Sequence, residues 1–557
     1  MRKITTVIAL ILCLSFCVAA FAACGKDKKP AKTDPPVSTT AAVTTDRWDV
    51  DGPAIAAALS EAEKTFKIEV AEFNEVEKAS KNKMYLVGPD DEELEEGDVS
   101  TIEQMVYDRN KAAKQLLGTT IEYEYWNYSQ SGWNKAQKQI NTVVSSETEG
   151  APDLFVNQIY DLNKVMLTLG AFQDVWSIPG SYFDFKAAGW MDDWMQSLSF
   201  TGDRAYVLAG DYFVDVLRSM GVMPFNATLM DETASKLAPA LFEGGLSDGE
   251  TMSQRFFDYV EAGNWTWDAL GKLCEAVFDD KNGDDQADMG DVLGTIADCY
   301  GGVNTAVFIY SCGEELIDRR PNAEKGGKMW AYYPSDPSSI GDIFDKVASV
   351  FNGTGALATT GVVADTENGL ASHRIKFAKN EILFLGYALL GDLEDDTFQQ
   401  MQSLYSVVPL PKVSTDKQYN TFVTDTADAG AINVHSTKAR AISAYLQYCT
   451  EHSAEIREEF LEIVTKYKTT VYNQGTDRML DLIYDSILYG GAKVIDGAVK
   501  DDGGYRRWYD FMKDGECVVT SAEFISEFNS CVEAKQTTLD EVLDKWYKLP
   551  KVEATEE

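Results

Sequence analysis

The chain of 557 residues is too long for one hydrophobic core, and at about 100 to 200 residues per domain it should form two or three folded units. Hydrophobic residues make up 45% of the chain, which is enough to build large cores. Because 50 Lys and Arg face 89 Asp and Glu, the formal net charge is −39, and no long basic cluster interrupts the acids. This balance excludes a nucleic-acid-binding protein, since a phosphate backbone is bound by clustered cations.

The first residues have the three parts of an export signal. Arg2 and Lys3 form a charged start, an apolar run over 4–22 follows, and the run ends in small residues. We therefore expect residues 1–23 to be a signal peptide that is removed from the mature protein.

A cysteine follows these small residues directly. The sequence Ala22-Ala23-Cys24 resembles the bacterial lipobox, in which that cysteine receives a diacylglyceryl group and becomes the first residue of the mature protein. Phe21 stands where leucine is commonest in that pattern, and ordinary cleavage after Ala22 is the alternative. Lipidation of Cys24 is favoured because the residues that follow it suit a tether.

Residues 24–46 are rich in Lys, Pro, Thr, Ser and Ala and lack apolar periodicity. Such a composition buries too little apolar surface to offset the entropy of ordering, so a flexible tether of roughly 25 Å is expected. No second apolar run approaches the length of a membrane span. The lipid is therefore the expected membrane anchor, with the folded chain facing outward.

Neither the cysteines nor the histidines of the folded part form a metal-binding pattern. The six cysteines after Cys24 are widely spaced, and the three histidines lack zinc-site spacing. The spacing does not suggest a disulfide scaffold, but a disulfide bridge or two stays open. No cofactor is expected from these residues.

The first predicted elements alternate between helix and strand. The capping box from Ser100 to Glu103 starts a helix whose apolar residues recur at helical spacing until Gly118 ends it. Apolar and acidic residues then alternate over 121–125, which predicts a strand. This strand leads into a polar and aromatic loop over 126–130.

A second pair of elements repeats this order. A helix is predicted over 132–148 and a short apolar strand over 154–156, and a loop over 157–161 leads into a helix that Gly170 ends. Strands and helices with short connections are typical of parallel βαβ units. We therefore expect the loops after both strands at one edge of a sheet, where ligands bind in open α/β folds.

The order of several motifs resembles a known family. Residues 150–156 (GAPDLFV) followed by 169–175 (LGAFQDV) are similar to the family 1 extracellular solute-binding proteins of ABC importers, the maltose-binding-protein-like group. Residues 203–226 resemble that family's first crossing between lobes, 265–268 (WTWD) a helix start in the second lobe, and 405–412 (YSVVPLPK) its return strand. The resemblance is spread over most of the chain.

The resemblance implies an α/β fold with two lobes, of the periplasmic-binding-protein-like type II, with hinge strands and a ligand cleft between the lobes. It places 47–209 and 387–430 in lobe 1, and 210–386 and 431–557 in lobe 2. It also implies a monomer without enzymatic activity that closes its lobes around a solute and delivers it to an ABC transporter permease.

A carbohydrate, an oligosaccharide in particular, is the expected ligand. Sugars present apolar ring faces and hydroxyl groups, so a sugar site needs aromatic planes together with amide or carboxylate groups. Each aromatic residue taken alone is better explained by packing, and its position at a strand end is what gives it weight. The candidate ligand-binding residues are Trp126, Tyr128, Gln130, Gln158, Tyr160, Asp161, Asp211, Tyr212, Tyr387, Thr424 and Asp425.

An acidic loop over 280–291 has the oxygen spacing of an EF-hand calcium loop. Asp285 replaces the turn glycine and Asp291 replaces the glutamate of that pattern, so a solvated acidic loop is an equally good interpretation. Bound calcium would have a structural role. The candidate ligands are Asp280, Asn282, Asp284, Asp288 and Asp291.

Two patterns in the sequence are typical of catalytic sites. Residues 245–249 (GLSDG) match a nucleophile elbow, but the preceding residues do not alternate like a strand, so a solvent loop is expected. Carboxylate pairs for glycoside hydrolysis stay open because 89 acidic residues make chance pairs abundant. A secreted glycan hydrolase is therefore one alternative, and a binding protein for a peptide or another polar solute is the other.

Overall fold

The computed structural model divides into two compact units, Met1–Asp49 and Val50–Glu557. In the first unit, the described residues 46–49 contain the start of helix α2 (Arg47–Ala58). The expected signal peptide, the tether up to residue 45 and Cys24 lie outside the described residues. The described residues are 46–72, 82–97, 99–127, 135–146, 150–298, 303–314, 317–359, 372–424, 426–466, 473–488 and 519–549.

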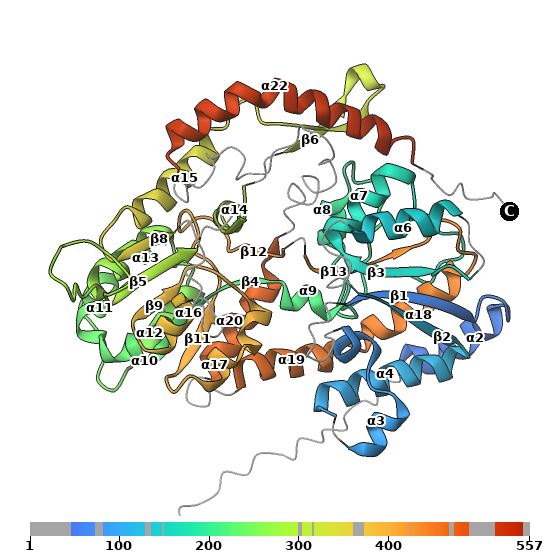
Figure 1. Cartoon of the computed structure of the whole chain (residues 1–557), viewed down its shortest axis with the longest axis horizontal. Coiled ribbons are helices and arrows are strands. Elements are labelled where there is room, and N and C mark those ends of the chain that lie inside the picture. The colour runs from blue at the N-terminus through green and yellow to red at the C-terminus, as the bar shows by residue number, and fades with distance from the viewer. Residues whose placement is uncertain are drawn as a thin grey trace, which may run out of the picture. The chain divides into compact units, whose positions relative to one another are not determined.

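Lobe 1 of the second unit is built on a four-stranded sheet in the order β2-β1-β3-β13 (Figure 1). The central strand β1 (Thr65–Glu72) pairs in parallel with both β2 (Thr120–Asn127) and β3 (Leu154–Gln158). Strand β13 (Asp428–Ile432) joins β3 in the antiparallel direction. The carboxyl ends of β1, β2 and β3 therefore share one edge with the start of β13.

Helices cover both faces of this sheet. On one face Phe66 of β1 contacts Tyr445, and on the other Ala71 of β1 packs against Ala136. Successive side chains of a strand point to opposite faces, so residues 66 and 71 of β1 face opposite sides. Tyr445 lies in α18 and Ala136 in α6, and these two helices therefore cover opposite faces of the sheet. The helical elements of lobe 1 are η1 (Lys83–Val87), α3 (Asp91–Glu96), α4 (Thr101–Leu117), α6 (Lys135–Ser146), α7 (Ile159–Leu169), α8 (Asp192–Leu198) and α18 (Ala439–Glu451).

The predicted helix after the capping box is confirmed. The Ser100 side chain accepts from the Glu103 backbone, and the Glu103 side chain accepts from the Ser100 backbone at 2.8 Å. Gly118 ends the helix with φ at 66°, a left-handed conformation that suits glycine. The predicted strands at 121–125 and 154–156 and the parallel arrangement of both are also confirmed.

Lobe 2 is built on a second sheet, in the order β10-β4-β9-β5-β8, with β11 also paired to β4. Its core is rich in aromatic residues, with Trp265 stacked on Phe384 at 5.2 Å between ring centroids. The strands are β4 (Gly221–Asn226), β5 (Leu293–Asp298), β8 (Ala356–Thr359), β9 (Ile382–Leu385), β10 (Ala388–Leu389) and β11 (Tyr405–Val408). The helical elements are α10 (Ala227–Glu232), α11 (Ala234–Leu241), α12 (Met252–Glu261), α13 (Trp267–Val277), α14 (Val303–Ser311), α15 (Ser338–Phe351), α16 (Ser372–Ala378), η4 (Leu390–Glu394) and α17 (Asp396–Gln400).

Strand pairing differs from the lobe boundaries expected from the sequence. Strands β10 and β11 fall within 387–430, the range expected in lobe 1, yet both pair with β4 of lobe 2. Helix α18, expected in lobe 2, packs on α4 of lobe 1. The chain therefore returns to lobe 1 at β13 and not near Tyr387. Strand partners depend on tertiary context, which a local pattern does not reveal.

Among the described residues, three chain segments connect the lobes. The first contains α9 (Val214–Arg218), between the bridge of Leu208 to Gly430 and strand β4. The second runs from β12 (Thr421–Phe422) to β13. The third contains α19 (Ala454–Lys466), which packs on α4 in lobe 1, and α20 (Asn473–Asp485), which packs on α12 in lobe 2. A short strand, β14 (Ile487–Leu488), pairs with β12.

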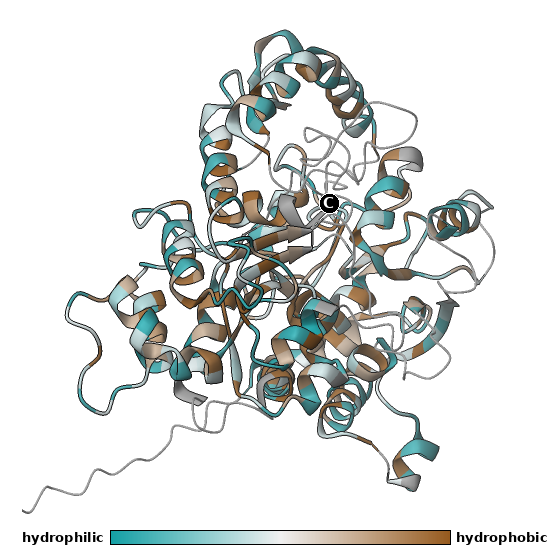
Figure 2. Ribbon diagram, turned by 60° about the vertical axis from the view of Figure 1, so that its left-hand side comes forward, coloured by the Kyte–Doolittle hydropathy of each residue, from teal (hydrophilic) through white to brown (hydrophobic). Residues whose placement is uncertain are grey.

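A long helix and a hairpin complete the described structure. Helix α22 (Ser521–Trp546) packs on α15, and strands β6 (Asp318–Asn322) and β7 (Lys328–Tyr332) form an antiparallel hairpin around the short helix η3 (Ala323–Lys325). Teal and brown segments alternate along α22 at the top of Figure 2, as expected of a helix with one packed face. No described helix has the length and apolar character of a membrane span.

Candidate functional site

The candidate site lies where β3 ends and β13 begins, beside the segments that connect the lobes. Gln158 stands directly opposite Asp428 in the antiparallel pair, and both residues are buried. Among the described residues, Gln158 Oε1 and Asp428 Oδ1 have no hydrogen-bond partner. Buried polar atoms normally have a hydrogen-bond partner. Two neighbouring atoms without one therefore mark a place where a polar ligand could supply the missing hydrogen bonds.

The Asp428 carboxyl is held by Asn82. Asn82 Nδ2 donates to Asp428 Oδ2 at 2.5 Å and to the Ala71 carbonyl at 2.7 Å. Burial, and then repulsion by Asp215, raises the pKa of Asp428 well above its ordinary value. A carboxyl group can accept hydrogen bonds in either protonation state.

Arg218 of α9 connects this edge of lobe 1 to lobe 2. Its guanidinium pairs with Asp215 at 2.6 Å and with Glu394 of η4 at 3.3 Å. Tyr85 of η1 donates to the same Glu394 carboxylate at 2.8 Å. Because the Asp428 backbone amide donates to Asp215 at 3.0 Å, the ion-pair network continues into the candidate site.

Asp211 forms a second buried network at the start of the first connecting segment. Arg457 of α19 pairs with its carboxylate at 2.7 Å, and the Tyr484 hydroxyl of α20 donates to it at 2.9 Å. Burial raises the pKa of Asp211 to about 6, against the opposing effect of Arg457. The first and third connecting segments are thereby fixed to each other.

Four of the sequence-predicted residues lie at the carboxyl edge of the lobe 1 sheet. The loop expected over 157–161 is not a loop, because Gln158 ends β3 while Tyr160 and Asp161 lie in the first turn of α7. Asp161 is buried and accepts from Gln137 at 2.8 Å, and the Tyr160 hydroxyl accepts from Lys164 at 2.7 Å.

Trp126, the fourth of these residues, lies near the end of β2. It is half-buried and packs against Ala71 and Ala136 on the α6 side of the sheet. Its indole Nε1 has no hydrogen-bond partner within the described ranges.

The remaining predicted residues lie at the connecting segments or outside the described residues. Asp211 and Tyr212 are fully buried, and Arg109 lies over the Tyr212 ring at 4.8 Å. The Thr424 amide donates to the Ser219 carbonyl at 3.1 Å, and the Tyr387 ring lies beside Gly221. Tyr128, Gln130 and Asp425 lie outside the described residues. Ligand contact by the eleven candidates stays a prediction.

Sequence reasoning missed most residues that build this site. Arg218 lies in a five-residue helix and Glu394 in a 3₁₀ turn, and neither has a motif that would have singled it out. Asn82 lies at the start of η1, without a recognisable pattern. Asp428 had a usable signal, because it begins a buried strand three residues after the predicted Asp425.

The acidic loop at 280–291 is folded by its own side chains. Asp280 accepts from the amides of Gly283 and Asp285, and buried Asp291 accepts from the amides of Lys281 and Asp288. Asp285 takes a positive φ of 59° in the place of the turn glycine. No group of three or more His, Cys, Asp or Glu side chains suited to hold a metal ion occurs in the described ranges. Calcium binding by Asp280, Asn282, Asp284, Asp288 and Asp291 stays a prediction.

The interpretation of 245–249 as a loop is confirmed. Helix α11, and not a strand, precedes this segment, and Gly245 and Gly249 both take positive φ values. A nucleophile elbow requires a strand before the serine and a helix after it. Ser247 therefore lacks the backbone setting of that motif.

Glu69 of β1 is a buried acid outside the ion-pair networks. Gln139 of α6 donates to its Oε2 at 2.5 Å, while Glu69 Oε1 and Gln139 Oε1 both lack a partner among the described residues. Burial, aided by repulsion from Glu124 and opposed by the Gln139 bond, raises the pKa of Glu69 to about 7. The proton of the neutral form would give Gln139 Oε1 its missing donor.

No protein-family model matches the sequence. No curated protein matches it. Several solved structures are similar in fold. The ABC transporter associated binding protein of B. animalis subsp. lactis, in complex with β-1,6-galactobiose, is 13% identical with a TM-score of 0.46, over 85% of this chain and 98% of that chain. The cyclic α-maltosyl-1,6-maltose binding protein of Arthrobacter globiformis is 10% identical with a TM-score of 0.46, over 86% of this chain and 98% of that chain. An uncharacterized protein of Listeria monocytogenes is 11% identical with a TM-score of 0.49, over 86% and 100%.

The raised pKa of Glu69 predicts a pH dependence of stability. Between pH 4.5, the ordinary pKa, and about 7, the folded chain keeps a proton that the unfolded chain releases, so the free energy of unfolding falls as pH rises. Glu69→Gln cannot ionise and supplies an amide to Gln139. We expect it to raise the free energy of unfolding by about 2 kcal/mol at pH 8 and to change it little at pH 5.

Denaturant unfolding at both pH values measures this effect. Glu122→Gln, on the exposed side of neighbouring β2, is the matched control. It should leave the free energy of unfolding unchanged at both pH 5 and pH 8. An equal effect of Glu69→Gln at the two pH values would contradict the assignment.

Proposed function

We propose that this chain is an extracellular substrate-binding lipoprotein that captures a carbohydrate and delivers it to an ABC transporter permease. The observation that carries the proposal is the pair of buried oxygens on Gln158 and Asp428 that have no hydrogen-bond partner among the described residues. They lie where the parallel strands β1, β2 and β3 end and the antiparallel strand β13 begins, at the edge where open α/β folds bind ligands. They also lie beside the segments through which one lobe would move against the other.

The chemistry of this edge suits a sugar. Gln158 and Asp428 each offer an acceptor oxygen, which suits the hydrogen-bond-donating hydroxyl groups of a sugar. Trp126, at the end of β2, has an indole N–H without a partner among the described residues, but it packs on the α6 side of the sheet. The strand register places Gln158 and Asp428 on the opposite, α18 side. An oligosaccharide has enough hydroxyls to use this edge of lobe 1 and to contact lobe 2 at the same time.

Capture would work by a shift of population between two arrangements of the lobes. A sugar that contacts both lobes favours the closed arrangement by its difference in affinity for the two states. Hinges of this kind are a few residues that absorb the change in backbone angles. The connecting segments, with α9 at one of them, are the place where such a change would occur.

Binding to a panel of oligosaccharides, measured by isothermal titration calorimetry, tests the proposed function. Gln158→Leu removes the amide at nearly constant volume, and we expect it to weaken binding of the tightest sugar at least tenfold, or about 1.4 kcal/mol. Glu122→Gln serves as the control and should bind normally. The proposal is wrong if no sugar of the panel binds, and a sugar product released during the titration would favour the hydrolase.

Membrane attachment through Cys24 is the second part of the proposal. In a bacterial expression host, Cys24→Ser should abolish incorporation of labelled fatty acid and move the protein from the membrane fraction to the soluble fraction. Cys17→Ser, inside the expected signal peptide, is the matched control and should change neither result. Undiminished labelling of the Cys24 variant would contradict lipidation at this residue.

A further inference from the structure

Helix α22 is fixed to lobe 2 along most of its length. At its start, the Phe524 ring stacks on Phe344 of α15 at 4.6 Å, and the Ser521 amide donates to Asp345 at 2.7 Å. Further along, the Trp330 indole of the β6–β7 hairpin donates to Asp540 at 2.7 Å. The helix and the hairpin therefore form one structural unit on lobe 2.

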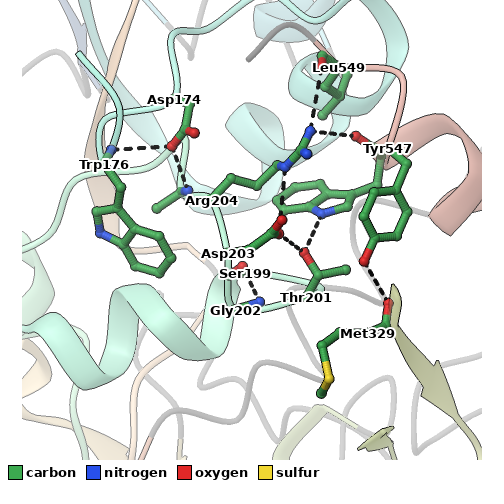
Figure 3. Close-up of polar contacts among 12 residues, drawn as sticks. Asp174, Trp176, Ser199, Thr201, Gly202, Asp203, Arg204, Met329, Tyr547 and Leu549 are labelled. Carbon is green, nitrogen blue, oxygen red and sulfur yellow. Dashed lines mark hydrogen bonds and ion pairs between the residues drawn. The ribbon is translucent and has the colours of Figure 1, made fainter. Parts of the chain in front are cut away.

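The end of α22 is fixed to lobe 1. The Trp546 ring packs on Phe200 and Tyr206 at 4.9 and 5.2 Å, and its indole Nε1 donates to Thr201 Oγ1 at 2.7 Å. Figure 3 shows the Arg204 side chain reaching the end of the helix, where its guanidinium donates to the Trp546 and Leu549 carbonyls at 3.4 and 3.5 Å. All of these contacts are buried.

The lobe 1 segment that receives α22 belongs firmly to that lobe. The Val175 amide donates to the Ala205 carbonyl at 2.7 Å, and Leu208 exchanges backbone hydrogen bonds with Gly430 of β13. The hairpin reaches the same region, because Arg319 donates to the Ser197 carbonyl at 2.7 Å. Helix α22 and its hairpin thus join the lobes without being one of the connecting segments.

This attachment lies apart from the connecting segments. In Figure 1, α22 runs along the top from α15 toward α7, whereas α9 lies near the centre and α19 toward the bottom. A body joined at one side can rotate freely, but a body joined at two separated places cannot. A rotation about the connecting segments that moves lobe 2 away from residues 199–206 must therefore break or bend the contacts at one end of α22.

We propose that α22 is a strap that holds the two lobes together, and that its release from residues 199–206 permits the lobes to separate for ligand exchange. The strap rests on the proposed function, because it regulates access to the same site. Its releasable end is the lobe 1 end, where α22 is held by Trp546 and by two backbone carbonyls that Arg204 binds. The other end is held by a longer series of contacts on α15 and β7.

Single-molecule energy transfer between dyes tests the strap without any ligand. The dyes are attached at Glu122 in lobe 1 and at Glu243 in lobe 2, both of which are exposed. The double variant Thr201→Val/Arg204→Met removes the side chains that hold the end of α22. We expect it to raise the ratio of separated to adjacent lobes at least fivefold, since one buried hydrogen bond contributes about 1 kcal/mol.

Lys325→Met is the matched control. It removes the ion pair of Lys325 with Asp544 of α22 at 2.9 Å, a half-exposed contact with the hairpin that does not reach lobe 1. The control should leave the ratio unchanged. If circular dichroism shows that the double variant does not fold, the single variant Thr201→Val is used in its place. Its ratio of separated to adjacent lobes then decides.

The strap proposal would be overturned if the folded variant has the same ratio of separated to adjacent lobes as the unaltered protein. An equal change of this ratio in the control would also overturn it. Because no sugar is added, this result is independent of sugar binding. A chain that binds no sugar but separates in the double variant would contradict the proposed function and retain the strap.

Discussion

The arrangement of this protein depends on partly buried ion pairs at the segments that connect its two lobes. Asp211 is paired with Arg457, and Arg218 is paired with Asp215 and Glu394. Burying charges costs much of the energy that pairing returns, so such pairs contribute more to a defined arrangement than to stability. Loss of one partner is costly, by about 3 to 5 kcal/mol, because it leaves an uncompensated buried charge. The ion pairs therefore fix the connecting segments relative to each other. Asp428 is part of this arrangement because its backbone amide donates to Asp215.

Local chemistry in the sequence was sufficient to predict much of lobe 1. The helix that starts at Ser100 has a capping box and a terminal glycine, and both act in the structure as expected. The central strand β1 was missed, although Phe66, Ile68 and Val70 alternate with polar residues as in a half-buried strand. Long-range pairing decided the rest, and no local pattern places β10 and β11 on β4.

The sequence indicates which strand ends carry candidate residues, but not which residues meet there. Gln158 lies at the carboxyl end of β3, as the sequence predicts, and ligand binding at this edge stays a prediction. Asp428, its partner in the strand pair, lies 270 residues further along the chain. Only the antiparallel pairing of β13 with β3 brings Asp428 opposite Gln158. Arg218 and Glu394 are joined in the same way, across 176 residues. A sequence pattern can indicate where strands end, but the residues that meet there are chosen by the topology of both sheets.

A crystal structure of the protein with the sugar that binds most tightly would test the central claim most directly. The account predicts sugar hydroxyls within hydrogen-bond distance of Gln158 Oε1 and the Asp428 carboxyl, with further contacts from lobe 2. A sugar bound elsewhere, with these two oxygens still unpartnered, would contradict the assignment of the site.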